Sequence, residues 1–317
     1  MMSRRTSLGL MMGAAAAPAV VAQAQAQAQT QTPAQTPAIT GGVDAHAHVF
    51  TRDLPTAPGS RYTVDYDATP RAFLDLLEAR GLSRGVIVQP SFLGADNRYL
   101  LDTLVAHPDR FRGVVVVPET IGQERLDAMA GLGVVGVRLN LIGRPDPDLA
   151  SPAWRSHLAA LANLDWQVEI QCEAQRLPGL LPQLAGAGVK IVLDHLGRPD
   201  PDIGVDDPGF RYLLAQAETG RIWVKLSGEY RIGATLAAQA AARLLDAFGP
   251  SRLVWGSDWP HTQFEAAASY AAAFAALSRW APSPDMRRQI LVDTPVALFG
   301  FYDRPVAAAP SLLKHAH

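Results

Sequence analysis

The sequence is poor in the features that mark several classes of protein. Its 317 residues contain one cysteine, Cys172, so the chain can form no internal disulfide and no thiolate cluster around a metal. Charged residues make up 18% of the chain, the formal net charge is −2, and no block of like charge occurs. The composition therefore argues against a nucleic acid or an anionic membrane surface as the partner.

The first forty residues lack the pattern of a folded domain. Residues 1–28 begin with paired arginines, continue through a moderately apolar stretch and offer repeated Ala-x-Ala sites, which predicts a bacterial export signal. The arginines in SRRTSLGL are typical of the twin-arginine route, and an ordinary secretory signal is the alternative. Residues 29–40, QTQTPAQTPAIT, are predicted to be a disordered linker. We therefore expect the mature protein to be periplasmic or secreted.

Short β-branched runs then alternate with amphipathic stretches. The runs cover residues 43–50, 84–91, 111–119, 134–140, 166–173, 190–197, 222–228 and 252–260. Eight β-then-α units in about 250 residues are typical of a closed (β/α)8 barrel of the TIM type. A doubly wound open sheet would also alternate, but no G-x-G-x-x-G turn follows the first run. We predict an α/β fold with a single barrel over residues 41–304 and a tail over 305–317.

Polar residues stand where the predicted strands end. They are His46, His48, Ser91, Arg138, Asn140, Gln171, Glu173, His195, Lys225, Ser227 and Asp258. In a (β/α)8 barrel, functional groups gather at the carboxyl ends of the strands. The fold would therefore bring His46, His48, His195 and Asp258 to one mouth.

The His-x-His spacing of His46 and His48 is by itself weak evidence for a functional site, because the C-terminal KHAH has the same spacing. His46 and His48 differ from that tail by lying in a buried strand pattern, where residues two apart point to the same face. The alternatives are that the histidines are core residues with satisfied hydrogen bonds, and that Asp258 caps the following helix. His261, three residues beyond Asp258, is close enough to the mouth for its role to stay open.

The motifs around these residues, DAHAHVF, DHLGRPD and WGSDWPH, resemble those of the amidohydrolase superfamily. The similarity is greatest to its lactonase branch, typified by 2-pyrone-4,6-dicarboxylate hydrolase, and runs through most of residues 41–304. The resemblance implies a metallo-dependent-hydrolase-like barrel that hydrolyses an ester or lactone bond by water attack. It implies that Asp258 is the base and that His46, His48 and His195 polarise the carbonyl, directly or through a metal.

The resemblance also marks a set of substrate contacts. The set comprises Tyr62, Ser91, Arg138, Arg144, Arg198 and Arg231, to which we add Gln171 at the end of the fifth run. Arginine suits carboxylates because its guanidinium offers paired donors in a fixed plane. Any one of these arginines could instead anchor a loop through an ion pair.

Whether the protein binds a metal ion is judged from the types of side chain that could act as ligands. Three histidines and Asp258 suit one zinc ion as possible metal ligands, whereas the pyrone-dicarboxylate branch implies a mechanism without metal. Metal-dependent members usually end strand five with lysine, histidine or glutamate, where this chain has Gln171. Because Gln171 is a poor bridging ligand, we expect either no metal or one divalent ion, zinc fitting best.

These observations predict an exported hydrolase that opens a small, anionic, carboxylated lactone. The mature chain is expected to have no nucleic-acid or membrane partner, and the sequence leaves the oligomeric state open. One alternative is a metal-dependent decarboxylase of a carboxylated aromatic acid. The other is a non-catalytic periplasmic barrel that binds a carboxylate.

Overall fold

Eight parallel strands form one sheet whose strand order follows the chain. The computed structural model describes residues 41–302, so the predicted signal, linker and tail lie outside the described residues. The strands are β1 (Gly42–Ala47), β2 (Leu82–Val88), β3 (Phe111–Val115), β4 (Val134–Asn140), β5 (Gln167–Gln171), β6 (Lys190–Leu193), β7 (Ile222–Leu226) and β8 (Leu253–Trp255). Each of the eight expected runs overlaps one of these strands.

The sheet closes between β1 and the segment that follows β8. The backbone N–H of Asp258 donates to the His46 carbonyl at 2.9 Å, and that of His48 donates to the Trp259 carbonyl at 2.8 Å. Ala47 and Trp259 also form a parallel bridge. The prediction of a (β/α)8 barrel is therefore confirmed.

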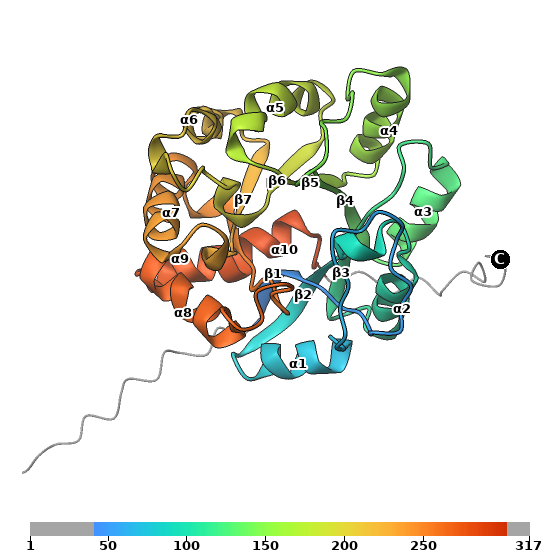
Figure 1. Cartoon of the computed structure of the whole chain (residues 1–317), viewed down its shortest axis with the longest axis horizontal. Coiled ribbons are helices and arrows are strands. Elements are labelled where there is room, and N and C mark those ends of the chain that lie inside the picture. The colour runs from blue at the N-terminus through green and yellow to red at the C-terminus, as the bar shows by residue number, and fades with distance from the viewer. Residues whose placement is uncertain (1–40, 303–317) are drawn as a thin grey trace, which may run out of the picture. The chain divides into compact units, whose positions relative to one another are not determined.

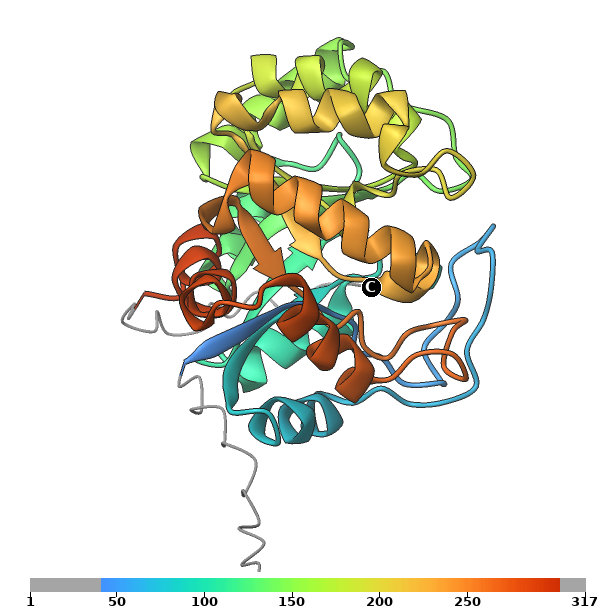
Figure 2. The ribbon, with the colours of Figure 1, turned by 90° about the vertical axis from the view of Figure 1, so that its left-hand side faces the viewer.

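Helices follow the strands and surround them (Figure 1; Figure 2). They are α1 (Pro70–Glu78), α2 (Arg98–Ala106), α3 (Gln123–Gly131), α4 (Pro152–Asn163), α5 (Leu177–Gly186), α6 (Pro208–Ala215), α7 (Ala234–Phe248), α8 (Tyr270–Trp280), α9 (Pro284–Arg288) and α10 (Thr294–Leu298). Side chains of Thr69, Ser151 and Asp207 cap α1, α4 and α6, and each cap is followed by a proline that suits the first turn. Over residues 41–302, no helix combines the length and the apolar character needed to cross a membrane.

Strand β1 carries one extra residue relative to β2 in the stretch between Asp44 and Ala47. Asp44 pairs with Gly85 and Ala47 pairs with Ile87, so three steps along β1 match two along β2. Such a bulge changes the face on which the following side chains emerge. Ala45 packs in an apolar cluster shared by several strands, and the next residue, His46, still reaches the charged groups of the barrel interior.

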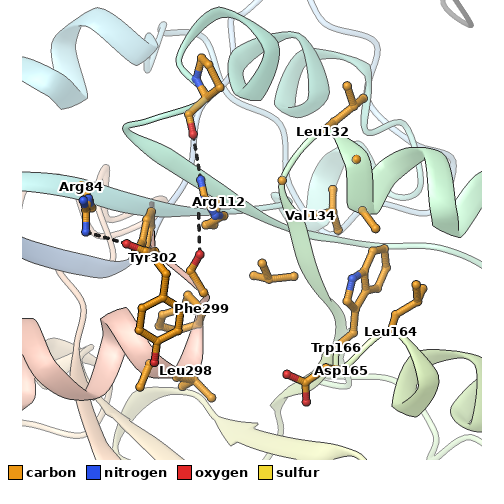
Figure 3. Close-up of a pocket in the computed structure, with 18 of the residues that line it drawn as sticks. Arg84, Arg112, Leu132, Val134, Leu164, Asp165, Trp166, Leu298, Phe299 and Tyr302 are labelled. Atoms are coloured by element: carbon orange, nitrogen blue, oxygen red, sulfur yellow. Dashed lines mark hydrogen bonds between the residues drawn. The ribbon is translucent and has the colours of Figure 1, made fainter. Parts of the chain in front are cut away.

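The segment after α10 lies against the amino ends of the strands. Phe301 joins the inner apolar cluster, and the guanidinium groups of Arg84 and Arg112 lie 5.5 and 4.7 Å from its ring centroid. A cavity of about 460 Å³ opens beside these residues, lined by the starts of β4 and β5 and by Tyr302 (Figure 3). Both ends of the described chain therefore lie opposite the carboxyl ends of the strands.

Candidate active site

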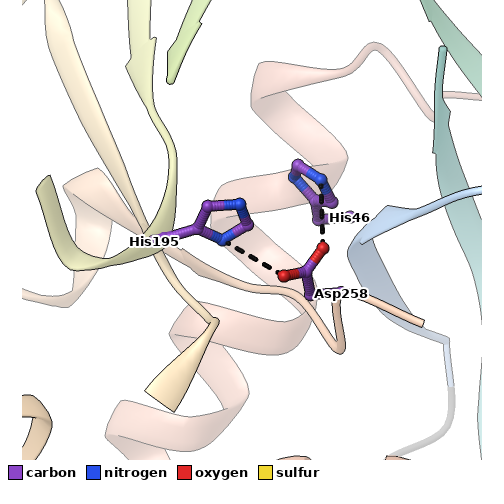
Figure 4. Close-up of side chains that lie close together, drawn as sticks. All are labelled: His46, His195 and Asp258. Atoms are coloured by element: carbon purple, nitrogen blue, oxygen red, sulfur yellow. Dashed lines mark ion pairs between the residues drawn. The ribbon is translucent and has the colours of Figure 1, made fainter. Parts of the chain in front are cut away.

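Asp258, which follows β8, is the centre of the site. Its Oδ1 lies 3.7 Å from His46 Nε2 and 3.6 Å from His48 Nε2, and its Oδ2 lies 3.7 Å from His195 Nδ1. Figure 4 shows the ring of His46 facing one oxygen of this carboxylate and the ring of His195 facing the other. The structure thus brings together the four residues that the sequence placed at one mouth.

The backbone around these side chains allows them to lie close to neighbouring segments. Asp258 adopts a positive φ of 61°, which is uncommon for a residue with a side chain. A Cβ on Gly256 would lie 2.6 Å from the His46 Cβ, and one on Gly228, whose φ is +67°, would lie 2.9 Å from His195 Nδ1. Glycine at these two positions therefore leaves room for the histidine rings.

Three polar atoms of the site have no hydrogen-bond partner among residues 41–302. They are Nε2 of His46, Nε2 of His195 and Oδ1 of Asp258, and all three are buried. Burial is the main cause that lowers the pKa of His46 to about 3 and that of His195 well below its usual value. Both rings are therefore neutral: the free Nε2 of His46 faces Asp258, whereas His195 faces Asp258 through Nδ1, which also bonds to the Ser227 hydroxyl, and keeps its own Nε2 free.

The donor set fits one divalent metal ion. His46, His195 and Asp258 each offer a ligand atom, and these atoms lie within 4.8 Å of one another. The Nδ1 atom of His48 lies 2.7 Å from the Val88 carbonyl and donates to it, which leaves the lone pair on Nε2 facing Asp258. Neutral imidazole and carboxylate are ordinary zinc ligands.

The second oxygen of Asp258 is already engaged. Its Oδ2 accepts from the Tyr230 hydroxyl at 2.6 Å and from Arg231 Nε at 2.9 Å, while Arg231 Nη2 lies 2.8 Å away. Burial alone would raise the pKa of Asp258, but Arg231 and the nearby histidines outweigh it and hold that pKa well below its usual range. Arg231, predicted to contact substrate, here fixes the carboxylate, so Oδ1 is the oxygen left for chemistry.

Charged residues fill the barrel interior beneath the histidines. Lys225 is hydrogen-bonded to Glu169 and lies 3.5 Å from Asp194 Oδ1. Arg138 lies 3.1 Å from Asp194 Oδ2 and donates to Gln171 Oε1 at 2.6 Å. Two cations thus meet two carboxylates, and the side chains of all four are almost fully buried. Arg138 and Gln171, predicted to contact substrate, bond to each other in this buried layer.

This charged layer contacts the histidines of the candidate site at His46. Its Nδ1 lies 3.0 Å from Lys225 Nζ and 3.1 Å from Asp194 Oδ1. An ammonium group only donates and a carboxylate only accepts, so the two neighbours favour opposite tautomers. With Lys225 as the partner, the proton sits on Nε2 and can be donated to substrate. With Asp194 as the partner, Nε2 is free to bind a metal.

The other predicted substrate contacts differ in their surroundings. The Tyr62 hydroxyl lies 3.0 Å from Ser91 Oγ, which joins the loops after β1 and β2. Arg198 is half-buried without an ion pair in the described chain, and its pKa is lowered by burial and by the positive charge of Arg231. The Arg144 side chain is exposed and makes no hydrogen bond or ion pair over residues 41–302. Their contact with substrate stays a prediction.

The family model described as "Amidohydrolase" matches residues 43–301, most of the chain and the whole barrel. The chain belongs to the amidohydrolase family. The superfamily membership predicted from the three motifs is therefore confirmed.

Relatives of this amidohydrolase include several lactone hydrolases. A 2-pyrone-4,6-dicarboxylate hydrolase of Comamonas testosteroni is 32% identical over 281 residues, covering 82% of this chain and 90% of the relative. A 4-sulfomuconolactone hydrolase of Hydrogenophaga intermedia is 31% identical over 272 residues, covering 82% and 89%. A solved structure from Acinetobacter baumannii, described as a "probable" 2-pyrone-4,6-dicarboxylic acid hydrolase with citric acid bound, is 37% identical. It has a TM-score of 0.80 and covers 82% of this chain and 100% of its own.

Sequence reasoning missed Glu169, Asp194 and Tyr230 of this amidohydrolase site, and it named Lys225 only as a polar residue where the seventh run ends. Glu169, Asp194 and Lys225 form the charged layer, and Tyr230 binds Asp258. The signal was the alternation in VEIQ, VLD and VKL, where one charged residue interrupts a buried apolar strand. That pattern implies that each charge is paired inside the barrel, but it does not name the partner.

Proposed function

We propose that this amidohydrolase hydrolyses the ester bond of a small carboxylated lactone. The observation that carries the proposal is the free, buried Oδ1 of Asp258, which faces His46 and His48 at the mouth of the barrel while His195 lies beside the other oxygen. The lactone hydrolases among the relatives support the same class of substrate. Hydrolase action on ester or lactone bonds, as expected from the sequence, agrees with the names of these relatives.

In the proposed reaction, Asp258 Oδ1 takes a proton from water while the water oxygen attacks the lactone carbonyl. The Nε2–H groups of His46, in the tautomer that has Lys225 as its partner, and of His195 donate to the carbonyl oxygen as it gains negative charge. The bond to the ring oxygen then breaks, and that oxygen receives the proton held by Asp258. Tyr230 and Arg231 keep the carboxylate oriented throughout because they hold only Oδ2.

A divalent ion, zinc by ligand preference, would be held by His46, His48, His195 and Asp258, and when bound it would polarise the carbonyl. We expect elemental analysis of the purified protein to give no more than one divalent ion per chain. The reason is that Gln171, which already bonds to Arg138, offers no anionic bridge for a second ion. Two ions per chain would contradict this expectation.

Arg198 is proposed to bind a carboxylate of the substrate. Replacing Arg198 with methionine should raise KM for a dianionic lactone by about 10- to 100-fold, as expected for loss of a hydrogen bond to a charged group. The change in kcat should be small. The same replacement of Arg155, an exposed arginine on α4, is the control.

Steady-state kinetics with charged and uncharged lactones of the same ring size would check this prediction. The effect should disappear for the uncharged lactone, because that substrate carries no group for the guanidinium to bind. An equal loss of affinity for both lactones would show that Arg198 supports the loop and does not bind the carboxylate.

A further inference from the structure

The segment after β8 holds unusual backbone conformations at three nearby positions. Asp258, His261 and Gln263 have φ values of 61°, 66° and 72°. Each is a non-glycine residue in the left-handed region, which costs free energy and persists only where surrounding structure imposes it. Asp258 is the central carboxylate of the site, and the same backbone turn fixes His261: its N–H donates to the Asp258 carbonyl at 2.8 Å.

The His261 imidazole is buried without any hydrogen-bond partner in the described chain. The residue is 3% exposed, yet neither Nδ1 nor Nε2 is satisfied. The site histidines differ, since His48 bonds to the Val88 carbonyl and His195 bonds to the Ser227 hydroxyl. Burying an imidazole with both nitrogens unpaired is costly, so a ligand is expected to satisfy them.

The surroundings of His261 are those of the active site. Its ring meets the Tyr230 ring edge-on, with centroids 5.6 Å apart, and the Tyr230 hydroxyl holds Asp258 Oδ2. The nearest acid on the same segment, Glu265, is occupied by the Tyr66 hydroxyl at 2.6 Å and by the Gln263 N–H. Burial is the main cause that lowers the pKa of His261, so its ring is neutral and offers one donor and one acceptor.

We propose that His261 is a further catalytic residue, which hydrogen-bonds the ring oxygen of the lactone as that oxygen leaves. This inference rests on the proposed lactone hydrolysis. His261 gives up no proton: the proton on the product hydroxyl is the one that Asp258 took from water. The imidazole N–H donates to the leaving oxygen while negative charge builds on it, and it keeps this hydrogen bond once the oxygen is protonated.

The test uses carboxylated lactones whose leaving oxygens range from an acidic enol to an alkyl alcohol. The stabilising hydrogen bond matters most when the leaving oxygen is a poor leaving group. His261→Phe should therefore lose about 10- to 100-fold in kcat for the alkyl alcohol, and much less for the enol. His261→Asn should recover part of the loss, because its amide can still donate. His157→Phe is the matched control, since His157 is also buried with an unpaired Nδ1 but lies on α4.

An equal loss for every lactone, or no loss, would overturn the role of His261 while leaving the hydrolase proposal intact. A wild-type protein that opens none of the lactones would overturn both. A measurement on the unmodified protein covers the case in which the variants do not fold. The ring ¹⁵N resonances of His261 should shift when the hydroxy-acid product is added, and unchanged resonances at saturation would overturn the contact.

Discussion

Replacing Asp258 with asparagine is expected to lower kcat/KM for a carboxylated lactone by about 10²- to 10⁴-fold, the range for loss of a general base. The amide has nearly the same shape and can still accept from Tyr230 and Arg231 through its oxygen. It cannot take a proton from water, which is the role assigned to the free Oδ1. Substrate affinity should change far less than turnover.

Single-turnover and steady-state rates measured beside thermal unfolding would separate chemistry from folding. Asp165→Asn is the control, because Asp165 forms an exposed ion pair with Lys190 away from the site. Its activity should match that of the unmodified protein. If Asp258→Asn keeps more than about a tenth of the activity, a loss smaller than general bases give, Asp258 is not the base.

Replacing Lys225 with methionine is expected to lower the free energy of unfolding by about 3–5 kcal/mol, the range for removing one partner of a buried ion pair. Lys225 and Glu169 are both fully buried, so the variant leaves Glu169 with Arg138 Nε, 3.8 Å from its Oε1, as the remaining cation. The matched control is Lys190→Met, whose pair with Asp165 is exposed and should contribute less than about 1 kcal/mol.

The decrease in the free energy of unfolding of the Lys225→Met variant should depend on pH. Burial and the nearby Asp194 already raise the pKa of Glu169 to about 8, and losing Lys225 favours the protonated form further. A carboxyl group with a raised folded-state pKa stabilises the fold at low pH, and this contribution is lost as pH rises from about 4.5 towards that pKa. Well below pH 8, Glu169 is protonated with or without Lys225, so the two proteins differ most as pH rises above that value. Urea unfolding of the variant should therefore show a larger loss at pH 9 than at pH 5. A loss equal to that of Lys190→Met at both values would contradict the role of the buried pair.

The barrel was predictable because its strands are continuous apolar runs with a polar end. LVW of β8 followed by GSD, and KIVL of β6 followed by DH, show this directly. The extra residue in β1 was not predictable, since DAHAH carries no local signal for a bulge. Successive side chains of a regular strand point to opposite faces, but because of this bulge Ala45 and His46 both reach the barrel interior.

The site was predictable in its centre and less so around it. His46, His48, His195 and Asp258 meet because strand ends of a closed barrel share one face. The partner of Arg138 could not be predicted, because the carboxylate that binds it lies 56 residues away along the chain. A one-dimensional pattern shows that a buried charge needs a partner, but only the fold selects which one.

The amino end of β1 and Tyr302 both lie at the end of the barrel opposite Asp258. A solid support, a fused protein or an affinity handle joined through either end would therefore face away from the catalytic mouth. The mouth would stay open to substrates arriving from solution. Residues 41 and 302, at which the described structure begins and ends, are thus suitable points for attachment away from the predicted site.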